Sequence, residues 1–202
     1  MSTKSEKYRI LLSRIAAAAG FFLFCVTRSY WETSNEKFTL ALSFLGTFLV
    51  AISALGRLWC SLYIAGYKDN RLVTEGPYSI SRNPLYLFSA IGAVGIGCAT
   101  DTFTFPLALI VLFTLYYPLV IKSEEVRLRQ LYGAKYEEYM KRVPTFFPKF
   151  SAFHEPEDYT VKPIVFRRHI FSAVWFIWII GIIELIQRLR QAGLWSAQWP
   201  LY

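Results

Sequence analysis

Residues 103–121 read FTFPLALIVLFTLYYPLVI, a stretch without a single charged side chain. A helix needs about 20 apolar residues to cross the roughly 30 Å hydrocarbon core of a bilayer. A second run, at residues 38–60, contains one charge, Arg57, close to its end. Both runs are too long and too uniform for helices buried in a soluble core. They therefore predict a membrane protein.

The whole chain agrees with this class. Of its 202 residues, 54% are hydrophobic and 18% aromatic. The third apolar segment is short, and only residues 100–102 separate it from the fourth. This pair predicts a tight helical hairpin that is expected to stop before the far headgroups. The predicted fold is an all-α, polytopic transmembrane helical bundle of about five spans, at residues 10–27, 38–60, 84–99, 103–121 and 168–187.

Basic residues predict how the spans are oriented. Residues 122–149 hold seven Lys or Arg against four Glu, and Arg167 and Arg168 directly precede the last span. By the positive-inside rule, the N-terminus and residues 61–83 and 122–167 are expected to face the cytoplasm, with the C-terminus on the other side. We therefore expect an integral, multi-pass protein of a bacterial inner membrane or the endoplasmic reticulum, with its site on the cytoplasmic face.

The remaining composition excludes several classes of function. The net charge of +8 is explained by topology and by contact with anionic lipids, and the basic residues do not form one soluble face for nucleic acid. The three cysteines lie in or at the end of apolar spans, where they are expected to pack as small hydrophobes. The two histidines, His154 and His169, have no partner at ligand spacing. We expect neither a disulfide framework nor a metal site.

Polar residues gather in LVTEGPYSISRNPLYLF, residues 72–88. Gly76-Pro77 predicts a turn, Ser81 or Asn83 can cap the following helix, and Pro84 suits its first turn. The start of that helix would direct unpaired backbone amides at the cytoplasmic interface, which favours an anionic or polar ligand group. The alternative is that Arg82 only reaches the interface and that Asn83 only caps.

A second polar segment, residues 121–150, reads IKSEEVRLRQLYGAKYEEYMKRVPTFFPKF. The helix of the fourth span is expected to continue into it without a break and to fold back over the cytoplasmic mouth of the bundle until Pro144 ends it. Glu124 and Glu125 lie at the membrane edge, where two carboxylates favour a cationic partner; the alternative is a solvated helix start. The spacing of Leu128, Tyr132, Tyr136, Tyr139 and Val143 predicts that this helix is amphipathic, with these residues on one face. The alternative interpretation of the tyrosines is an aromatic belt at the membrane interface.

The two segments together predict one cavity at the cytoplasmic face. Carboxylates and aromatic rings suit a sulfonium or an ammonium group. Arginines suit a carboxylate or a phosphate.

The order Gly-Pro-Tyr, Arg-Asn-Pro-Leu-Tyr, a helical hairpin, Glu-Glu and YGAKYEEYMKRVPTFFP resembles the isoprenylcysteine carboxyl methyltransferase family and its phospholipid methyltransferase relatives. The resemblance covers roughly residues 65–150 and implies an S-adenosylmethionine-dependent methyltransferase. It implies two catalytic candidates, Arg142 to orient a carboxylate acceptor and Glu125, a base if the acceptor is an amine. The cofactor-binding residues that it implies are Tyr78, Arg82, Asn83, Pro84, Tyr86, Glu124, Glu125, Tyr136 and Tyr139.

The chain also departs from the family pattern. Asn83 stands where the isoprenylcysteine enzymes usually have histidine, and Phe88 replaces a common glycine. These departures keep the cofactor expectation and leave the acceptor open. The expected organisation is an N-terminal transmembrane pair (1–60), a catalytic core (61–150), and an acidic linker with a further span (151–202).

The implied acceptor is lipophilic, most simply the carboxylate of a prenylcysteine-like or other lipid molecule that approaches from the bilayer. Methyl transfer from a sulfonium needs alignment more than a proton relay, in keeping with the absence of an obvious catalytic His or Cys from the polar segments. Three alternatives stay open: a phospholipid amine N-methyltransferase, a nicotinamide-dependent membrane reductase of the sterol reductase type, and a non-catalytic membrane scaffold. Binding of S-adenosylmethionine, of a nicotinamide dinucleotide or of neither separates the last two from a methyltransferase.

Overall fold

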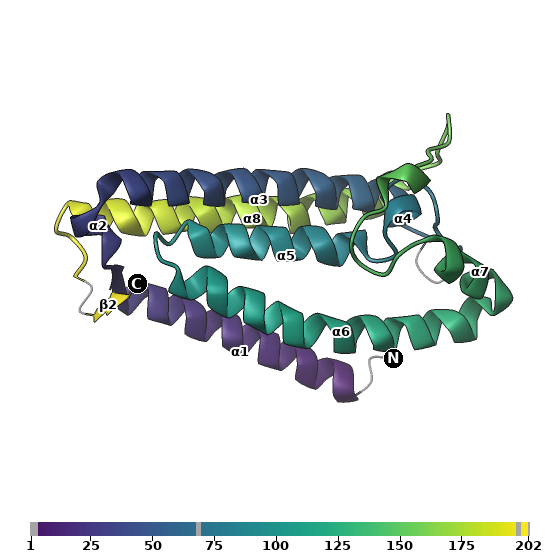
Figure 1. Ribbon diagram of the computed structural model, residues 1–202, viewed down its shortest axis with the longest axis horizontal. Helices are drawn as coiled ribbons and strands as arrows, with labels where there is room; N and C mark the ends of the chain where they lie inside the picture. Colours follow the sequence, from purple (N-terminus) through teal and green to yellow (C-terminus); the bar gives the residue numbers. More distant parts are fainter. Residues whose placement is uncertain (1–3, 68–69, 197–198, 202) are drawn as a thin grey trace.

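The computed structural model is a bundle of long helices with a minimal β component (Figure 1). It describes the chain except for residues 1–3, 68–69, 197–198 and 202. The long helices of this described part are α1 (Lys4–Val26), α3 (Glu36–Ile64), α5 (Pro84–Cys98), α6 (Thr104–Tyr132) and α8 (Pro163–Gln191). The short elements are α2 (Trp31–Ser34), α4 (Pro77–Ile80), α7 (Ala134–Arg142), the 3-10 turn η1 (Phe150–Ala152) and the parallel strand pair β1 (Thr27–Ser29) and β2 (Trp199–Leu201).

Three helices of the described part, α3, α6 and α8, are long and apolar enough to cross a bilayer, at 29 residues each. The apolar stretch Arg14–Val26 of α1 and the whole of α5 are shorter. With 15 residues, α5 rises only about 22 Å, less than the hydrocarbon core. The predicted helical membrane bundle is confirmed, and so is the short third segment. The expectation that the whole hairpin stops before the far headgroups was wrong for its second helix, because α6 is long enough to cross.

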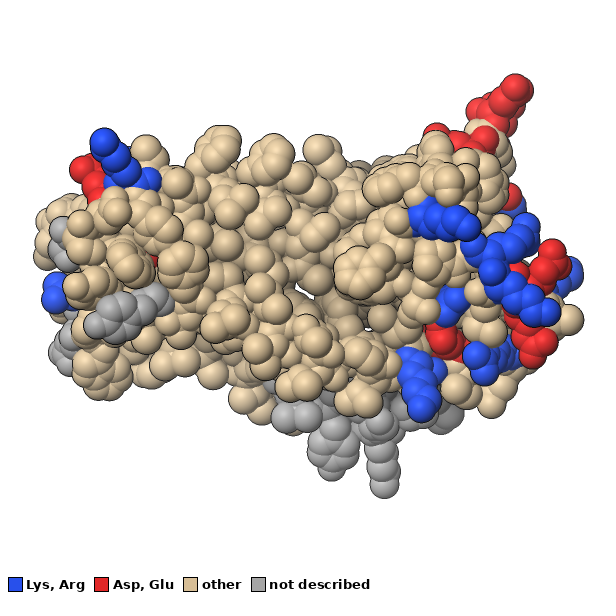
Figure 2. Space-filling view, viewed as in Figure 1, with Lys and Arg blue, Asp and Glu red and all other residues tan. Residues whose placement is uncertain are grey.

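The outer faces of the spans are apolar. Large hydrophobic side chains are exposed along all three long spans, and a soluble protein would not leave so much apolar area in water. Figure 2 shows the same distribution, with a wide uncharged band between two ends that carry the Lys, Arg, Asp and Glu side chains. Examples of these exposed side chains are Leu40, Phe44 and Phe48 of α3, Leu115 and Leu119 of α6, and Trp175 and Trp178 of α8.

Helices α3 and α5 approach each other closely because two glycines face each other. A Cβ atom on Gly46 would lie 2.6 Å from the carbonyl oxygen of Gly95, and one on Gly95 would lie 2.8 Å from that of Gly46. Small residues let helix backbones pack at this distance inside a membrane. The short α5 is therefore held against a span that crosses the whole bilayer.

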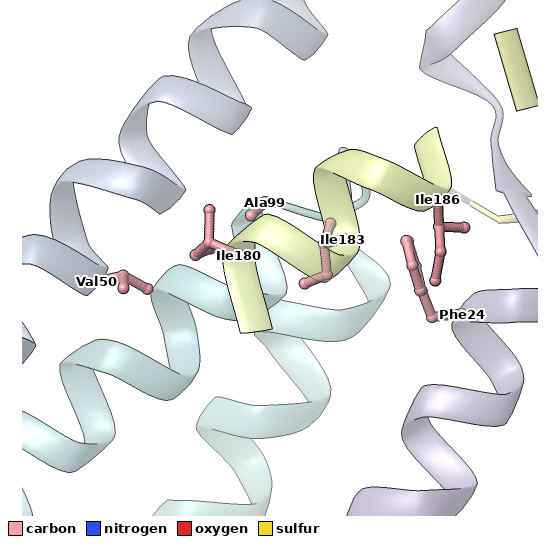
Figure 3. Close-up of a cluster of buried hydrophobic side chains, with 6 residues drawn as sticks. All are labelled: Phe24, Val50, Ala99, Ile180, Ile183 and Ile186. Carbon is pink, nitrogen blue, oxygen red and sulfur yellow. The ribbon is translucent and has the colours of Figure 1, made fainter. Parts of the chain in front are cut away.

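The end of the bundle near the C-terminus, called the far end below, is closed by apolar packing. Figure 3 shows its cluster of buried side chains, which joins α1, α3, α8 and the residue after α5. Two polar contacts support it: Gln187 Nε2 donates to Asp101 Oδ2 at 2.8 Å, and Trp195 Nε1 donates to the carbonyl of Cys25 at 3.0 Å. The members of the cluster are Phe24, Val50, Ala99, Ile180, Ile183 and Ile186.

The opposite end, called the site end below, carries α4, α7 and the loops around them (Figure 1). One sequence expectation was wrong here, because the helix of the fourth span does not continue unbroken to residue 143. It ends at Tyr132, and Gly133 takes a positive φ of 53° before α7 begins. Glycine adopts this conformation without steric cost. The break turns α7 back across the end of the bundle.

Candidate active site

A cavity of about 570 Å³ lies at the site end, between α7, the adjoining ends of the long helices, Gly66 and residues 70–73. A volume of this size is typical of cofactor sites. Two of the predicted cofactor-binding residues, Pro84 and Glu125, do not line it. The other seven do: Tyr78, Arg82, Asn83, Tyr86, Glu124, Tyr136 and Tyr139.

Arg82 ties three elements together at this cavity. Its guanidinium donates to Glu125 Oε1 from Nε at 3.1 Å and from Nη2 at 2.7 Å. It also donates to the carbonyls of Met140 and Val143 and to the hydroxyl of Thr145, at 3.0, 2.9 and 2.6 Å. Arg82 thereby links the start of α5 to α6 and to the end of α7. Arg82 is thus the cationic partner of Glu125, one of the two glutamates for which a cation was expected.

The local structure before α5 explains why Arg82 is so placed. Pro84 occupies the first turn of α5, as predicted. The Asn83 side chain does not cap the helix but donates to the carbonyl of Thr145 at 2.9 Å. The hydroxyl of Ser81 accepts a hydrogen bond from the backbone N–H of Asn83 at 3.3 Å and donates one to the carbonyl of Phe146 at 2.9 Å. The segment after α7 is thus bound to the segment before α5, with Arg82 between them.

The two adjacent glutamates differ in their surroundings. Glu125 forms an ion pair with Arg82, whereas Glu124 lines the cavity. The Tyr86 hydroxyl donates to Glu124 Oε2 at 2.9 Å, and Arg127 Nη2 approaches Glu124 Oε1 at 3.4 Å. About a third of the Glu124 side chain stays exposed, 31%. Glu124 is therefore the carboxylate that can face a positively charged ligand.

Tyrosines of α4 and α7 form a buried wall of the cavity. Tyr136 and Tyr139 are 1% and 3% exposed, and the Tyr139 hydroxyl donates to the carbonyl of Tyr78 at 2.7 Å. Burial, with a contribution from the Glu125 charge, raises the pKa of Tyr136 to about 12. The pKa of Tyr78 is raised well above its ordinary value, mainly by burial. Both hydroxyls are therefore neutral donors near pH 7, and the buried Tyr78 hydroxyl has no hydrogen-bond partner in the described structure.

Arg142 is not brought to the cavity. Its side chain is 65% exposed and lies 3.7 Å from Glu138 on the outer face of α7. The apolar stripe of α7, Tyr136 and Tyr139 with Val143, turns inward instead. Because α7 starts afresh after Gly133, its own helical phase decides which residues point outward.

Sequence reasoning missed four polar residues of the lining, Asn70, Arg71, Arg127 and His169. Arg127 follows Glu124 by three residues, so helical spacing places it on the same face and could have identified it. No local signal marks His169, because its position depends on how α8 packs beside α3. Arg71 lies in the irregular segment between α3 and α4, where spacing carries no information about direction.

Comparison with known proteins identifies the family. Residues 17–135, more than half of the chain, match the family model described as phospholipid methyltransferase. The chain belongs to this family. The fold, the enzyme class and the family that the sequence predicted are thereby confirmed: this is a membrane methyltransferase of the phospholipid methyltransferase family.

Individual relatives cover more of this methyltransferase than the family model does. It is 34% identical over 186 residues to the nickel-cobalt-cadmium resistance protein NccN of Alcaligenes xylosoxydans xylosoxydans, covering 92% of this chain and 86% of that protein. It is 34% identical over 192 residues to the cobalt-zinc-cadmium resistance protein CzcN of Cupriavidus metallidurans, covering 95% and 87%. It is 32% identical over 149 residues to protein-S-isoprenylcysteine O-methyltransferase B of Arabidopsis thaliana, covering 72% and 75%. No solved structure matches the chain.

Proposed function

We propose that this protein transfers a methyl group from S-adenosylmethionine, bound in the cavity at the site end, to the carboxylate of a lipophilic acceptor held in the membrane. One observation carries the proposal: seven residues implied by a sequence resemblance, from three separate stretches of chain, line a single cavity. The family supplies the reaction class, and the cavity supplies groups that suit this cofactor.

The lining fits the charges of the cofactor. The Glu124 carboxylate and the rings of Tyr86 and Tyr136 suit a sulfonium and an ammonium group. Arg71 and Arg127, which also line the cavity, suit the carboxylate of the amino acid part. When bound, the cofactor supplies a methyl group on positively charged sulfur, and the protein has to align a nucleophile with it.

A carboxylate acceptor fits better than an amine. A carboxylate is ionised at neutral pH and needs no base, whereas an amine has to lose a proton first. Glu125, the expected base, is bound by Arg82 and does not line the cavity. The relatives named as isoprenylcysteine O-methyltransferases support an oxygen nucleophile, and the family description keeps a phospholipid amine as the second candidate.

The acceptor role expected for Arg142 is not part of this proposal, because that side chain points away from the cavity. Residues 61–150 supply most of the lining, as the proposed catalytic core should, and Val165 and His169 of α8 complete it. We place the site end at the cytoplasmic face. Helix α1 starts and α8 ends at opposite ends of the bundle (Figure 1), as the predicted orientation requires.

Binding and turnover of the full-length protein in nanodiscs test the proposal. Isothermal titration should show binding of S-adenosylmethionine and none of a nicotinamide dinucleotide. Transfer of radiolabelled methyl should reach a farnesylcysteine analogue more readily than phosphatidylethanolamine. Binding of the nicotinamide dinucleotide alone would contradict the cofactor, and methylation of phosphatidylethanolamine alone would contradict the acceptor.

A matched pair of variants connects binding to the cavity. Glu124→Gln should weaken S-adenosylmethionine binding at least about 10-fold, because a charge-assisted contact is lost. Glu138→Gln makes the same chemical change on a side chain that is 71% exposed on the outer face of α7, and it should leave binding unchanged. Equal effects of the two substitutions would place the cofactor elsewhere.

A further inference from the structure

Arg57 is the one charged residue in the apolar run 38–60 of α3, and it turns toward neighbouring helices instead of lipid. Its Nη1 donates to the Ser89 hydroxyl of α5, and its Nη2 donates to the Ser172 hydroxyl of α8 at 2.9 Å. The guanidinium also lies over the ring of Phe176, 5.1 Å from its centroid. An ionisable residue within a membrane span is costly and usually marks a functional site.

No anion balances this arginine within the described chain. Its hydrogen-bond partners are neutral hydroxyls, and none of the ion pairs of the described residues includes it. Its Nε is buried and has no acceptor. Arg82, by contrast, has both of its donor edges occupied by Glu125 and by backbone carbonyls.

The arginine lies just beyond the cavity on its membrane side. Leu85, Tyr86 and His169 line the cavity, and Ser89 and Ser172 follow on the same helices, about one turn deeper. The ring of Tyr86 also contacts that of Tyr117, with 5.2 Å between centroids. Arg57, Ser89 and Ser172 do not line the cavity themselves, but they lie on the next turns of helices that do.

Two further buried hydroxyls in this region are unsatisfied. Ser53 lies one turn before Arg57 on α3, and Tyr78 lines the cavity; neither hydroxyl has a hydrogen-bond partner among the described residues. Buried polar groups without partners are unfavourable in an apolar environment. Together with the free Nε of Arg57, they indicate a place for a polar ligand group.

We propose that Arg57, positioned by Ser89 and Ser172, binds the carboxylate of the lipophilic acceptor. This inference rests on the proposed function and assigns the residue that recognises the acceptor. A guanidinium can bind a carboxylate through Nε and one Nη at the same time. The apolar tail of the same molecule would extend into the bilayer, while the cofactor enters the cavity from the opposite side.

The chemistry needs no proton transfer. A carboxylate oxygen forms a bond to the methyl carbon as the methyl–sulfur bond breaks, and the electron pair of that bond stays on sulfur. The acceptor changes from an anion into a neutral ester. The charge that binds it to Arg57 disappears in the reaction, so the product leaves more easily than the substrate.

Selectivity for charge tests the proposal without requiring turnover. The probes are N-acetyl-S-farnesylcysteine and its uncharged carboxamide, titrated against the full-length protein in phosphatidylcholine nanodiscs with and without S-adenosylhomocysteine. The parent should bind the acid at least about 10-fold more tightly than the amide, the range of a buried charge-assisted contact. Arg57→Gln should reduce this preference to near one, and Arg57→Lys should retain part of it because lysine keeps the charge but lacks the planar fork.

Arg167→Gln is the matched control, since this exposed arginine stands at the start of α8; it should keep the full preference for the acid. Affinity for S-adenosylhomocysteine reports folding and should change less than about twofold in Arg57→Gln. If Arg57→Gln fails to fold, Arg57→Lys decides: a fall in preference of at least about threefold supports the proposal, and an unchanged preference overturns it. A parent protein that binds acid and amide equally also overturns it.

The two proposals can fail separately. A parent that prefers the acid but binds no S-adenosylhomocysteine and transfers no methyl group would contradict the proposed function and leave the Arg57 anion site supported. A parent that methylates the acid while Arg57→Gln keeps its selectivity would contradict only the assignment of Arg57.

Discussion

The two ends of this bundle are held together by different contacts. At the far end, six buried apolar side chains, from Phe24 of α1 to Ile186 of α8, pack directly against one another. At the site end, the contacts are polar and surround a cavity, with Arg82 alone making five hydrogen bonds to side chains and carbonyls of three other segments. Close packing stabilises the fold whether or not a ligand is present. The polar end contains space and unsatisfied groups that a ligand can use.

The largest effect is expected from Arg82→Ala at the site end. It leaves Glu125, whose side chain is only 17% exposed, without its counter-charge, and it leaves the carbonyls of Met140 and Val143 without this donor. Loss of one partner from such a pair costs about 3–5 kcal/mol, so thermal unfolding should shift strongly and S-adenosylmethionine binding should become unmeasurable by calorimetry.

Arg142→Ala is the control for this substitution. Arg142 is 65% exposed and its ion pair with Glu138 is long, at 3.7 Å, and such surface pairs contribute little. The unfolding temperature should stay close to that of the parent, and the affinity for S-adenosylmethionine should stay within about twofold of the parent's. If Arg142→Ala weakened binding as much as Arg82→Ala, the orientation of α7 would be wrong.

An intermediate effect, confined to stability, is expected from Phe24→Ala at the far end. Phe24 is 4% exposed in the cluster of Figure 3, and its removal should cost about 1–3 kcal/mol, since lost packing is the main term inside a membrane. Thermal unfolding in nanodiscs measures this loss. Affinity for S-adenosylmethionine should not change, because the substitution is at the opposite end of the bundle.

Phe22→Ala is the control on the same helix, because Phe22 is 64% exposed on the apolar outer surface of the bundle. It should leave the unfolding temperature nearly unchanged. A large loss of cofactor affinity in Phe24→Ala would show that the two ends are coupled and would remove the contrast between them.

The smallest effect is expected from Tyr86→Phe, which removes one hydroxyl and keeps the ring beside Tyr117. The lost hydrogen bond to Glu124 should weaken S-adenosylmethionine binding by about 3- to 10-fold, from a net contribution of about 0.5–1.5 kcal/mol. Tyr86→Leu should weaken binding further by removing the ring as well. Identical affinities of the Phe variant and the parent would mean that Tyr86 contributes only its ring.

The sequence predicted most of the candidate site because its signals are local. Pro84 can only stand at the start of a helix, and it begins α5. The pattern Leu128, Tyr132, Tyr136, Tyr139 and Val143 predicted one apolar face, and these residues form a single cluster. Two polar segments next to apolar spans were expected to meet at one face of the membrane, and residues from both line the cavity.

Contacts between distant residues were not predictable in the same way. Arg82 could have bound a ligand directly, yet it pairs with Glu125, 43 residues further along the chain. Arg57 could have reached toward the interface, yet it lies between α5 and α8. In both cases the partner of the arginine depends on which helices are neighbours in the bundle, and the sequence alone does not predict which helices are neighbours.

The sequence by itself determined the membrane class, the helical segments and the short third segment, because length, hydrophobicity and proline act within a few residues of chain. Only the tertiary structure decided which side chains face the cavity. Each residue turns the direction of a side chain by about 100° in a helix, and the positive φ of Gly133 starts a new helix with its own phase. That phase points Tyr136 and Tyr139 inward and Arg142 outward.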